Sequence, residues 1–170
     1  NIMSGMEDLC IGGGAEMMST FGQNGGSPFM DNDNLRLRAV HPQPHQGICA
    51  DAIATLEGIE REALDQLAVV SQQRADHAIK NGHFDKSLIT VYKTDGTVAL
   101  DHEEFPRPQT TLEGLSQLKP SFEAMADYPL DDAGTTYRKM ILQKYPDLKI
   151  QHMHHAGNSS GVVDLSLINI

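Results

Sequence analysis

Three histidines near the C-terminal end, His152, His154 and His155, resemble a metal-binding cluster. If this segment is a β-strand, His152 and His154 lie on one face, because side chains alternate between the two faces of a strand. Imidazoles are common zinc ligands, but two of them do not complete a site. The spacing places no carboxylate or thiol beside them. We therefore expect no metal here and keep metal binding as the weakest hypothesis.

The two cysteines, Cys10 and Cys49, are the other candidates for reactive chemistry. Cys10 lies in the run 9–11, which predicts a short buried strand, and burial in apolar surroundings makes a thiol unreactive. Cys49 follows Ile48 at a helix start, where its pKa could be lowered, although packing is the favoured role. Two thiols in 170 residues form no disulfide framework and favour a reducing compartment. We expect the cytoplasm, or the mitochondrial or peroxisomal matrix in a eukaryote.

Three further features have a structural interpretation beside a functional one. The triple glycine 12–14 lacks the Gly-Lys-Ser/Thr ending of a phosphate-binding loop, so it predicts a packing turn. Arg107 stands between two prolines and, taken alone, is typical of a solvated loop. Ser159 and Ser160 could cap a following helix as well as contact a ligand, and the two roles are compatible.

The overall composition limits the classes of function that this chain can have. The formal charge of −10, from 13 basic and 23 acidic residues, argues against nucleic-acid binding, because such a surface repels phosphate backbones. No run of about 18 apolar residues predicts a membrane span. No basic segment with an apolar stretch opens the chain at Asn1, so we expect no signal peptide in this sequence. Its 170 residues suffice for one domain core or part of a larger domain.

The elements that position these residues are predicted from periodicity and turn residues. Helices are predicted over 50–56, 60–79, 111–118 and 135–145, and strands over 88–92 and 97–99. Residues 41–45 and 105–108 carry prolines and are predicted to be non-helical. His152 begins a predicted strand that leads into a glycine-rich turn.

The longest predicted helix, residues 60–79, has an amphipathic pattern. Its buried face is predicted to consist of Leu64, Leu67, Ala68, Ser71, Ala75 and Ala78. Its solvated face is predicted to carry Asp65, Gln72, Gln73, Arg74 and Asp76.

Several segments, in this order, resemble the thiolase family. They are Gly12 to Ser19, Glu60 to Asp65, Ser71 to Ala75, Gly82-His83-Phe84, Thr111-Leu112-Glu113, Leu118 to Phe122, and Ala156 to Asp164. The last of these is the most specific match. The resemblance covers nearly the whole chain except roughly Asp127 to Ile150, which is predicted to be an insertion, and the last six residues.

The resemblance implies an α/β fold, namely part of a thiolase-like layered α/β/α core with an inserted α+β loop domain. Residues 1–27 would belong to the N-terminal core, 28–147 to the loop domain with its coenzyme A contacts, and 148–170 to the return into the core. The family transfers acyl groups to or from coenzyme A with reversible carbon–carbon bond formation, as in acetyl-CoA acetyltransferase. Its substrate is an acyl-CoA and it uses no metal.

The resemblance also implies where the chemistry is done. The family uses a cysteine nucleophile, with a second cysteine and a histidine for proton transfer and an asparagine-linked water in an oxyanion hole. Neither Cys10 nor Cys49 aligns with a catalytic cysteine. We therefore expect the catalytic groups to lie upstream of Asn1 and beyond Ile170, with no catalytic residue in this chain.

Residues that would hold coenzyme A are implied on the same grounds: Leu37, His45, Gln46, Arg107, Ala156, Ser159, Ser160 and Val162. Gln46 stands in place of a family methionine, and Gly114 where some members have a serine. Arg107 is implied at the nucleotide end, because a guanidinium can stack on adenine and donate to phosphate. Ser160 is the implied polar contact with the pantetheine.

Two hypotheses follow for the function. In the first, the chain supplies the coenzyme A-binding part of a thiolase and is inactive alone. In the second, it is a non-catalytic thiolase-like module that binds acyl-CoA or a partner. The family implies a homodimer or homotetramer, and half a core would need its missing half or a partner, because it leaves sheet edges and apolar surface uncovered.

Overall fold

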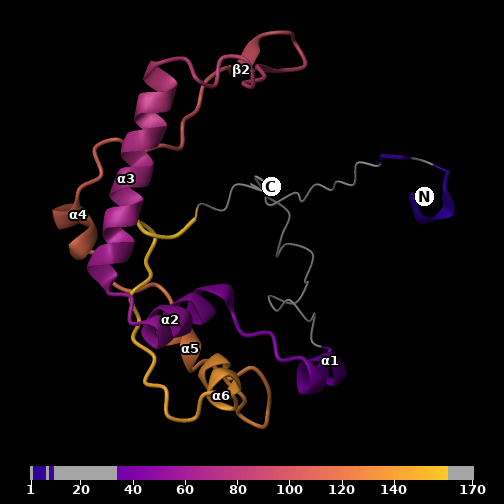
Figure 1. The fold of residues 1–170 in the computed structure, drawn as a ribbon, viewed down its shortest axis with the longest axis vertical. Coiled ribbons are helices and arrows are strands. Elements are labelled where there is room, and N and C mark those ends of the chain that lie inside the picture. Colours follow the sequence, from indigo (N-terminus) through magenta and orange to yellow (C-terminus); the bar gives the residue numbers. More distant parts are fainter. Residues whose placement is uncertain (1, 7, 10–33, 161–170) are drawn as a thin grey trace. The chain divides into compact units, whose positions relative to one another are not determined.

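The computed structural model describes residues 2–6, 8, 9 and 34–160 (Figure 1). The chain forms two compact units, one of residues 1–43 with 161–170 and one of residues 44–160. The described part of the first unit holds a 3-10 helix, Ile2–Ser4, and helix α1, Leu35–Val40. Asn34 caps α1, since its Oδ1 accepts from the Leu37 amide at 3.0 Å.

Helix α2 spans Gln46–Glu57 and begins earlier than the predicted helix over 50–56. His45 is its N-cap, and the imidazole Nδ1 accepts from the Gly47 amide at 3.1 Å. Gly58 ends the helix in the left-handed conformation, at φ 65°, which glycine adopts without steric cost. The helix buries Ile48 and Asp51 completely. The helix and its end at Gly58 are therefore as predicted. It starts earlier than predicted because His45 caps its first turn.

Helix α3 spans Arg61–Lys80, close to the predicted bounds, but the predicted division of its faces is wrong at Asp65 and Leu67. Asp65 was expected in solvent and is 2 % exposed, whereas Leu67 was expected inside and is 66 % exposed. The reason is that the Asp65 carboxylate accepts hydrogen bonds from residues about 90 positions along the chain. Hydrophobic periodicity cannot register such partners, and a buried carboxylate is stable when it is hydrogen-bonded.

A short hairpin follows α3. Strands β1, Val91–Tyr92, and β2, Val98–Leu100, pair antiparallel, with Val91 opposite Leu100. The turn at Asp95 and Gly96 is confirmed, because Gly96 has φ 82° and Asp95 Oδ1 accepts from the Thr97 amide at 2.9 Å. β1 holds only the last two residues of the predicted strand 88–92, and every residue of the hairpin is exposed. Figure 1 shows the hairpin at the C-terminal end of α3.

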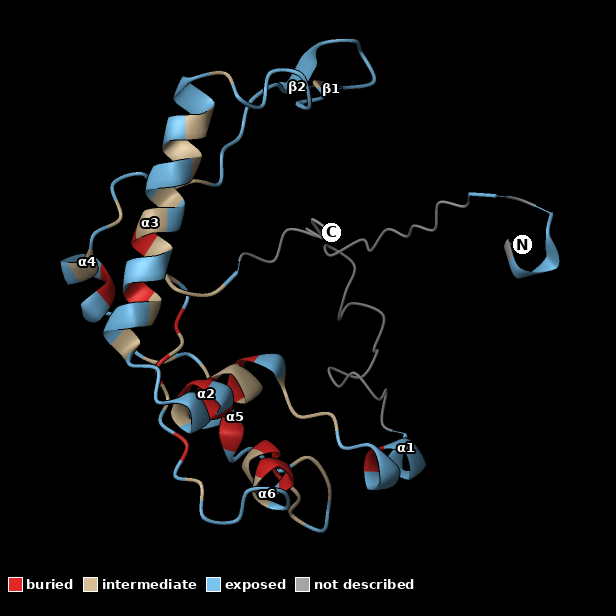
Figure 2. Ribbon diagram, viewed as in Figure 1, coloured by how far each residue is buried: buried red, intermediate tan, exposed pale blue. Residues whose placement is uncertain are grey.

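Three short helices complete the unit: α4, Leu112–Ser116, α5, Glu123–Ala126, and α6, Tyr137–Leu142. Thr111 caps α4, as predicted, and Thr136 caps α6 in the same way. α6 packs against α2 and α5, and α4 packs against α3. Figure 2 shows the buried positions on α2, α5 and α6, which include Ile48, Tyr137 and Met140.

The segment from His152 is not a strand. Residues 151–155 have no strand hydrogen bonding, and residues 156–158 form a turn. The amides of Gln151, Met153 and His154 donate instead to side chains of α2. Leu9 is likewise outside any strand and 80 % exposed, so that part of the predicted buried strand is wrong, and no strand of the described range pairs with it. Cys10, Ile11 and the triple glycine lie outside the described residues.

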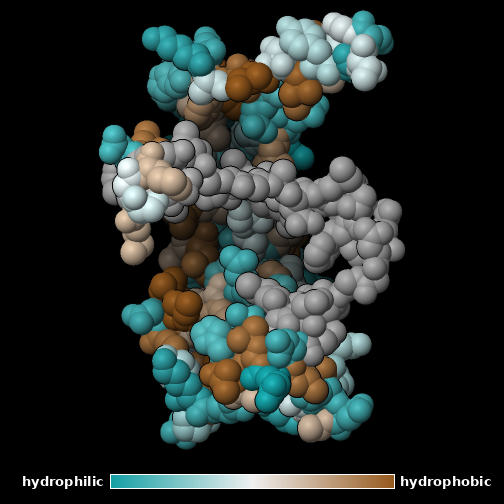
Figure 3. Space-filling view, turned by 90° about the vertical axis from the view of Figure 1, so that its right-hand side faces the viewer, coloured by the Kyte–Doolittle hydropathy of each residue, from teal (hydrophilic) through white to brown (hydrophobic). Residues whose placement is uncertain are grey.

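The regular secondary structure of the described residues is mostly helical, with one two-stranded sheet. The predicted non-helical segments 41–45 and 105–108 contain neither helix nor strand. Large hydrophobic side chains remain exposed, among them Ile53, Leu56, Leu67, Ile89 and Tyr92. Figure 3 shows such side chains open to solvent on the face toward the viewer. Within the described residues, no helix is both long and apolar enough to cross a membrane.

Candidate functional site

The most buried polar groups of the second unit hold one segment in place, residues 151–160, called here the return segment. Two carboxylates do most of this, Asp51 on α2 and Asp65 on α3. Both are almost completely buried, at 0 % and 2 % exposure. Because an isolated buried carboxylate is very unfavourable, each must be matched by several donors.

Asp51 takes its donors from the first half of the return segment. Its Oδ1 accepts from the amides of Met153 and His154, both at 3.0 Å, and from His154 Nδ1 at 2.7 Å. Its Oδ2 accepts from His152 Nδ1 at 2.8 Å. Burial alone would raise the pKa of Asp51, but these hydrogen bonds outweigh it and lower the pKa. In a β-strand these backbone amides would donate to a neighbouring strand. Here they donate to the side chain of Asp51 on helix α2.

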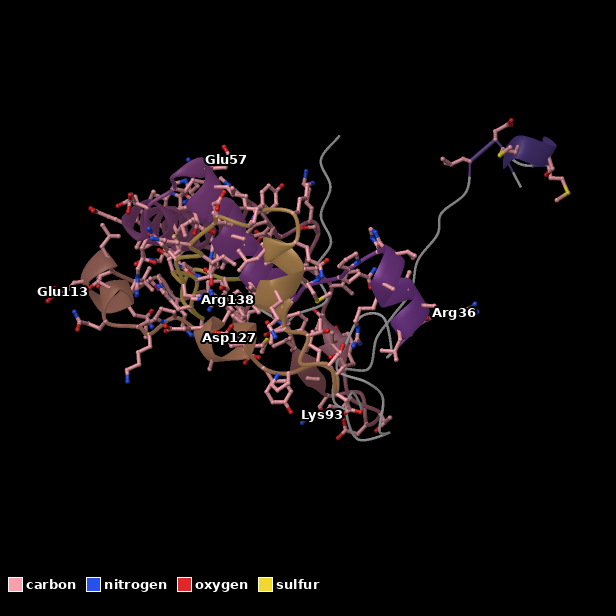
Figure 4. The ribbon with its side chains drawn as sticks, turned by 90° about the horizontal axis from the view of Figure 1, so that it is seen from below. Arg36, Glu57, Lys93, Glu113, Asp127 and Arg138 are labelled. Atoms are coloured by element: carbon pink, nitrogen blue, oxygen red, sulfur yellow. The ribbon has the colours of Figure 1, made fainter. Side chains whose placement is uncertain are left out.

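His152 continues this network to α6. Its Nε2 lies 3.0 Å from Arg138 Nη2, and a guanidinium can only donate, so Nε2 accepts and the proton lies on Nδ1. Arg138 also donates to both oxygens of Asp127, at 2.8 and 3.0 Å, and this lowers the pKa of Asp127. Figure 4 shows Arg138 and Asp127 next to one another. Charges therefore alternate from Asp127 through Arg138 to Asp51, with His152 as the bridge.

Asp65 takes its donors from the second half of the return segment. Its Oδ1 accepts from His155 Nε2 at 2.9 Å and from Asn158 Nδ2 at 2.8 Å. Arg61 Nε lies 3.4 Å from Oδ2 and also bonds across to α4, where Nη2 donates to the Leu115 and Leu118 carbonyls at 2.9 and 2.5 Å. α3, α4 and the return segment therefore meet around one ion pair.

The turn after His155 packs closely on α4. A Cβ placed on Gly157 would collide with the Leu115 side chain and approach Leu118 to 3.0 Å, so a larger residue would have to displace Leu115. A cavity of about 390 Å³ lies between α3 and α4, lined by Arg61, Glu62, Asp65, Leu112, Glu113 and Ser116. None of the residues predicted to hold coenzyme A lines this cavity.

Five of the predicted coenzyme A residues lie in two places. Ala156, Ser159 and Ser160 follow His155 in the turn, where Ala156 and Ser160 are exposed and Ser159 is half-buried. His45 caps α2, and its ring lies 5.4 Å from that of Phe122 and 6.0 Å from that of Tyr137, between ring centroids. Burial lowers the pKa of His45. Its neighbour Gln46, the first residue of α2, is exposed.

Arg107 lies elsewhere, in the exposed loop after the hairpin. Its Nη1 donates to the carbonyls of Glu104, Phe105 and Pro106, at 2.9, 2.6 and 3.2 Å. Its amide donates to Gln72 Oε1 of α3 at 2.6 Å. The guanidinium is therefore turned back on its own loop, which is the structural interpretation of this residue.

Two predicted contacts are not in the described part of the second unit. Leu37 belongs to α1 of the first unit and is 36 % exposed, and Val162 lies outside the described residues. Cys49 is half-buried, its Sγ lies 3.6 Å from the Pro44 carbonyl, and burial raises its pKa, so packing is the role that its surroundings support.

Two histidines of the cluster meet at one carboxylate, whereas His155 bonds to Asp65. His152 and His154 both donate Nδ1–H to Asp51, which stands 101 and 103 residues upstream. Within the described ranges no group of three or more histidine, cysteine or carboxylate side chains is arranged to hold a metal ion. The shared face was predicted for a strand that is not formed. Both imidazoles nevertheless reach Asp51, a distant partner that the spacing of the histidines could not reveal.

Sequence reasoning missed Asp51, Asp65, Asn158, Arg61 and Arg138. The only local signal is that Asp51 and Asp65 interrupt the apolar positions of their helices, beside Ile48 and Ala52 in one case and Leu64 and Val69 in the other. An acidic residue at such a position is rarely buried unless it is paired.

Comparison with known proteins gives a consistent result. The sequence profile described as "Thiolase, N-terminal domain" matches residues 1–127. The chain is 36% identical over 125 residues to a 3-ketoacyl-CoA thiolase of Vibrio vulnificus (strain CMCP6), and 37% identical over 125 residues to one of Cronobacter sakazakii. Each alignment covers 72% of this chain and 32% of the relative.

A mammalian relative agrees with the bacterial ones. The chain is 46% identical over 80 residues to the cytosolic acetyl-CoA acetyltransferase of Rattus norvegicus, covering 46% of this chain and 20% of that protein. The chain thus spans about a third of the length of the bacterial relatives that it matches. The profile match ends at Asp127, where the predicted insertion begins, so the likeness of residues 156–164 stays a prediction.

Proposed function

The chain belongs to the thiolase family, and we propose that it supplies the coenzyme A-binding part of an enzyme that exchanges acyl groups with coenzyme A while forming or cleaving a carbon–carbon bond. The observation that carries this proposal is the family match over residues 1–127, joined to a turn of predicted ligand residues that α3 and α4 hold rigidly. The relatives' names, 3-ketoacyl-CoA thiolase and acetyl-CoA acetyltransferase, support this reaction class and an acyl-CoA substrate.

The proposed division of labour assigns binding to this chain and bond chemistry to catalytic groups outside it. Ala156, Ser159 and Ser160 would meet the pantetheine, and Arg107 the nucleotide. Arg107 would have to release its own loop carbonyls, at most a few neutral acceptors, to reach a phosphate. Exchange of a carbonyl for a phosphate oxygen strengthens such a bond, because charge-assisted bonds are roughly twice as strong.

The domain division is proposed with the same bounds as the sequence predicts: core over 1–27, an inserted α+β loop domain over 28–147, and core again over 148–170. The exposed hydrophobic side chains of α2 and α3 support an interface, either with the remainder of a thiolase or with a second copy in a dimer or tetramer. The two cysteines support a reducing compartment, the cytoplasm or an organelle matrix.

Calorimetric titration of the 170-residue chain with coenzyme A tests the proposal. Binding is expected, and Arg107→Ala should weaken it about tenfold, as expected for loss of one charge-assisted contact. Arg74→Ala is the matched control, because Arg74 is another exposed arginine of the same unit. Absence of binding would contradict the proposal.

The alternative, a thiolase-like binding module without turnover, is separated by an activity assay. The chain alone should show no thiolysis of acetoacetyl-CoA, because neither cysteine matches a catalytic one. Addition of a protein carrying the complementary catalytic segments should restore turnover if the chain is part of an enzyme, and should leave it absent if the chain is a binding module. Cysteine-dependent thiolysis by the chain alone would contradict the assignment of catalysis to other segments.

A further inference from the structure

We propose that Asp65 is a positioning residue for the cofactor: it sets the shape of the turn at residues 156–160 and so prepares it for the pantetheine. The inference rests on the proposed coenzyme A function and assigns a role to a residue on a different element, helix α3, that makes no ligand contact itself. It begins from the carboxylate's burial, 2 % exposed in a helix whose periodicity would place it in solvent. A buried carboxylate is unfavourable unless hydrogen-bond donors are held beside it.

The first of those donors is His155, whose tautomer follows from its two neighbours. The Gly157 amide donates to His155 Nδ1 at 3.1 Å, so Nδ1 carries no proton. The proton is then on Nε2, which donates to Asp65 Oδ1 at 2.9 Å. The imidazole is 1 % exposed and connects the carboxylate of α3 directly to the backbone of the turn.

The second donor is Asn158, whose amide is engaged on both sides. Its Oδ1 accepts from the His155 amide at 2.8 Å, while its Nδ2 donates to Asp65 Oδ1 at 2.8 Å and to the Met153 carbonyl at 3.2 Å. The Asn158 amide also closes the turn by donating to the His155 carbonyl at 3.1 Å. One oxygen of Asp65 therefore orients both side chains that define the turn.

The other side of the turn is fixed by packing on α4. Gly157 lies so close to Leu115 and Leu118 that a methyl group does not fit. Arg61 joins the two supports, since it pairs with Asp65 and donates to the carbonyls that end α4. With its inner atoms engaged, the turn leaves Ala156 and Ser160 exposed, which are two of the predicted ligand contacts. A binding loop that is already in its bound shape loses less conformational entropy when the ligand arrives.

The test compares Asp65→Ala and Asp65→Asn with Asp76→Ala, by calorimetric titration of the chain with coenzyme A. Asp76 is the matched control, because it is a carboxylate on the same helix whose partner is Lys80, at 2.7 Å. Asp65→Ala should weaken binding about tenfold, the effect of leaving buried donors without a partner. Asp65→Asn keeps an acceptor oxygen and should restore affinity to within about threefold of the parent chain. Asp76→Ala should leave it unchanged.

Amide hydrogen exchange distinguishes positioning from a general loss of structure. In Asp65→Ala, the amides of Gly157, Asn158, Ser159 and Ser160 should exchange faster, while those of α2 and α6 keep their protection. If Asp65→Ala does not fold, Asn158→Ala interrupts the same link from a half-buried position and is expected to show the same two effects.

Each contrary result has a definite meaning. If the parent chain binds no coenzyme A, the proposed function fails and this inference fails with it. If the parent binds and the Asp65 and Asn158 variants bind equally well, the inference alone is overturned. It is also overturned if Asp65→Asn is as weak as Asp65→Ala, or if Asp76→Ala is equally weakened.

Discussion

Two segments of the same unit carry the predicted ligand contacts, and they are built in opposite ways. The return segment, residues 151–160, is held by the buried carboxylates Asp51 and Asp65 from helices about 90 to 100 residues upstream. The outer segment, residues 88–107, consists of an exposed hairpin and a loop in which Arg107 bonds to carbonyls of its own neighbours. The first is tied to distant helices by buried hydrogen bonds, whereas the Arg107 guanidinium of the second bonds to carbonyls of its own loop.

The difference shows how residues 151–155 satisfy their backbone amides without pairing to a neighbouring strand. Backbone amides that lack a neighbouring strand still need acceptors. At Met153 and His154 a single carboxylate supplies them. The hairpin, in contrast, pairs its own two strands and buries none of their residues, so little global stability depends on it.

The largest effect is expected for Asp51→Ala. It removes the acceptor of two backbone amides and two imidazoles at a site with no solvent access, so the free energy of unfolding should fall by about 3–5 kcal/mol. Urea denaturation of the variant against the parent chain measures it. A loss below about 1 kcal/mol would show that the return segment finds other acceptors.

Gly157→Ala should have the next largest effect. The added methyl group collides with Leu115, so the turn and α4 must separate, at a cost of about 1–3 kcal/mol. Gly114→Ala on α4 is the control, because its Cβ would approach only Thr111 Oγ1, at 3.2 Å. Thermal unfolding of both variants checks the contrast, and equal melting temperatures would contradict the close packing seen here.

The change of stability with pH should be smaller than the effects of these two substitutions. It should occur in two pH ranges, one for His45 and one for Asp51. Burial lowers the pKa of His45, so its contribution is complete above the unfolded value of about 6.5 and declines as the pH falls below it. The pKa of Asp51 is also lowered, so its contribution is complete above about 3.9 and is lost only at lower pH.

His45→Asn tests the first range, because asparagine retains an acceptor for the α2 N-cap and does not titrate. Chemical denaturation at pH 5 and pH 7 should give a smaller difference for this variant than for the parent chain. A larger difference would show that the first range has another origin.

The smallest effect is expected for Asp95→Ala in the hairpin turn. This carboxylate accepts from the amide and hydroxyl of Thr97 at 2.9 and 2.6 Å, in a fully exposed turn. The substitution should leave the melting temperature unchanged and accelerate amide exchange within residues 91–100. A clear drop in the melting temperature would show that global stability depends on the hairpin as well as on the return segment.

How far the sequence predicts this fold depends on the range over which each signal acts. The bounds of α3, the Thr111 cap of α4 and the Asp95-Gly96 turn are predicted correctly, because each follows from residues within a few positions. The strand at His152 and the solvated position of Asp65 are predicted wrongly, because their partners are distant in sequence. The coenzyme A residues remain predictions that rest on the family.

The sequence by itself determined the family and the main helices. These follow from local composition and from motifs in a fixed order. Only the tertiary structure decided that Asp51 and Asp65 lie inside, and that they are the partners of the three histidines. It also decided that a larger residue at Gly157 would have to displace Leu115. The physical reason is that burial of a charge is favourable only with donors that folding brings to it.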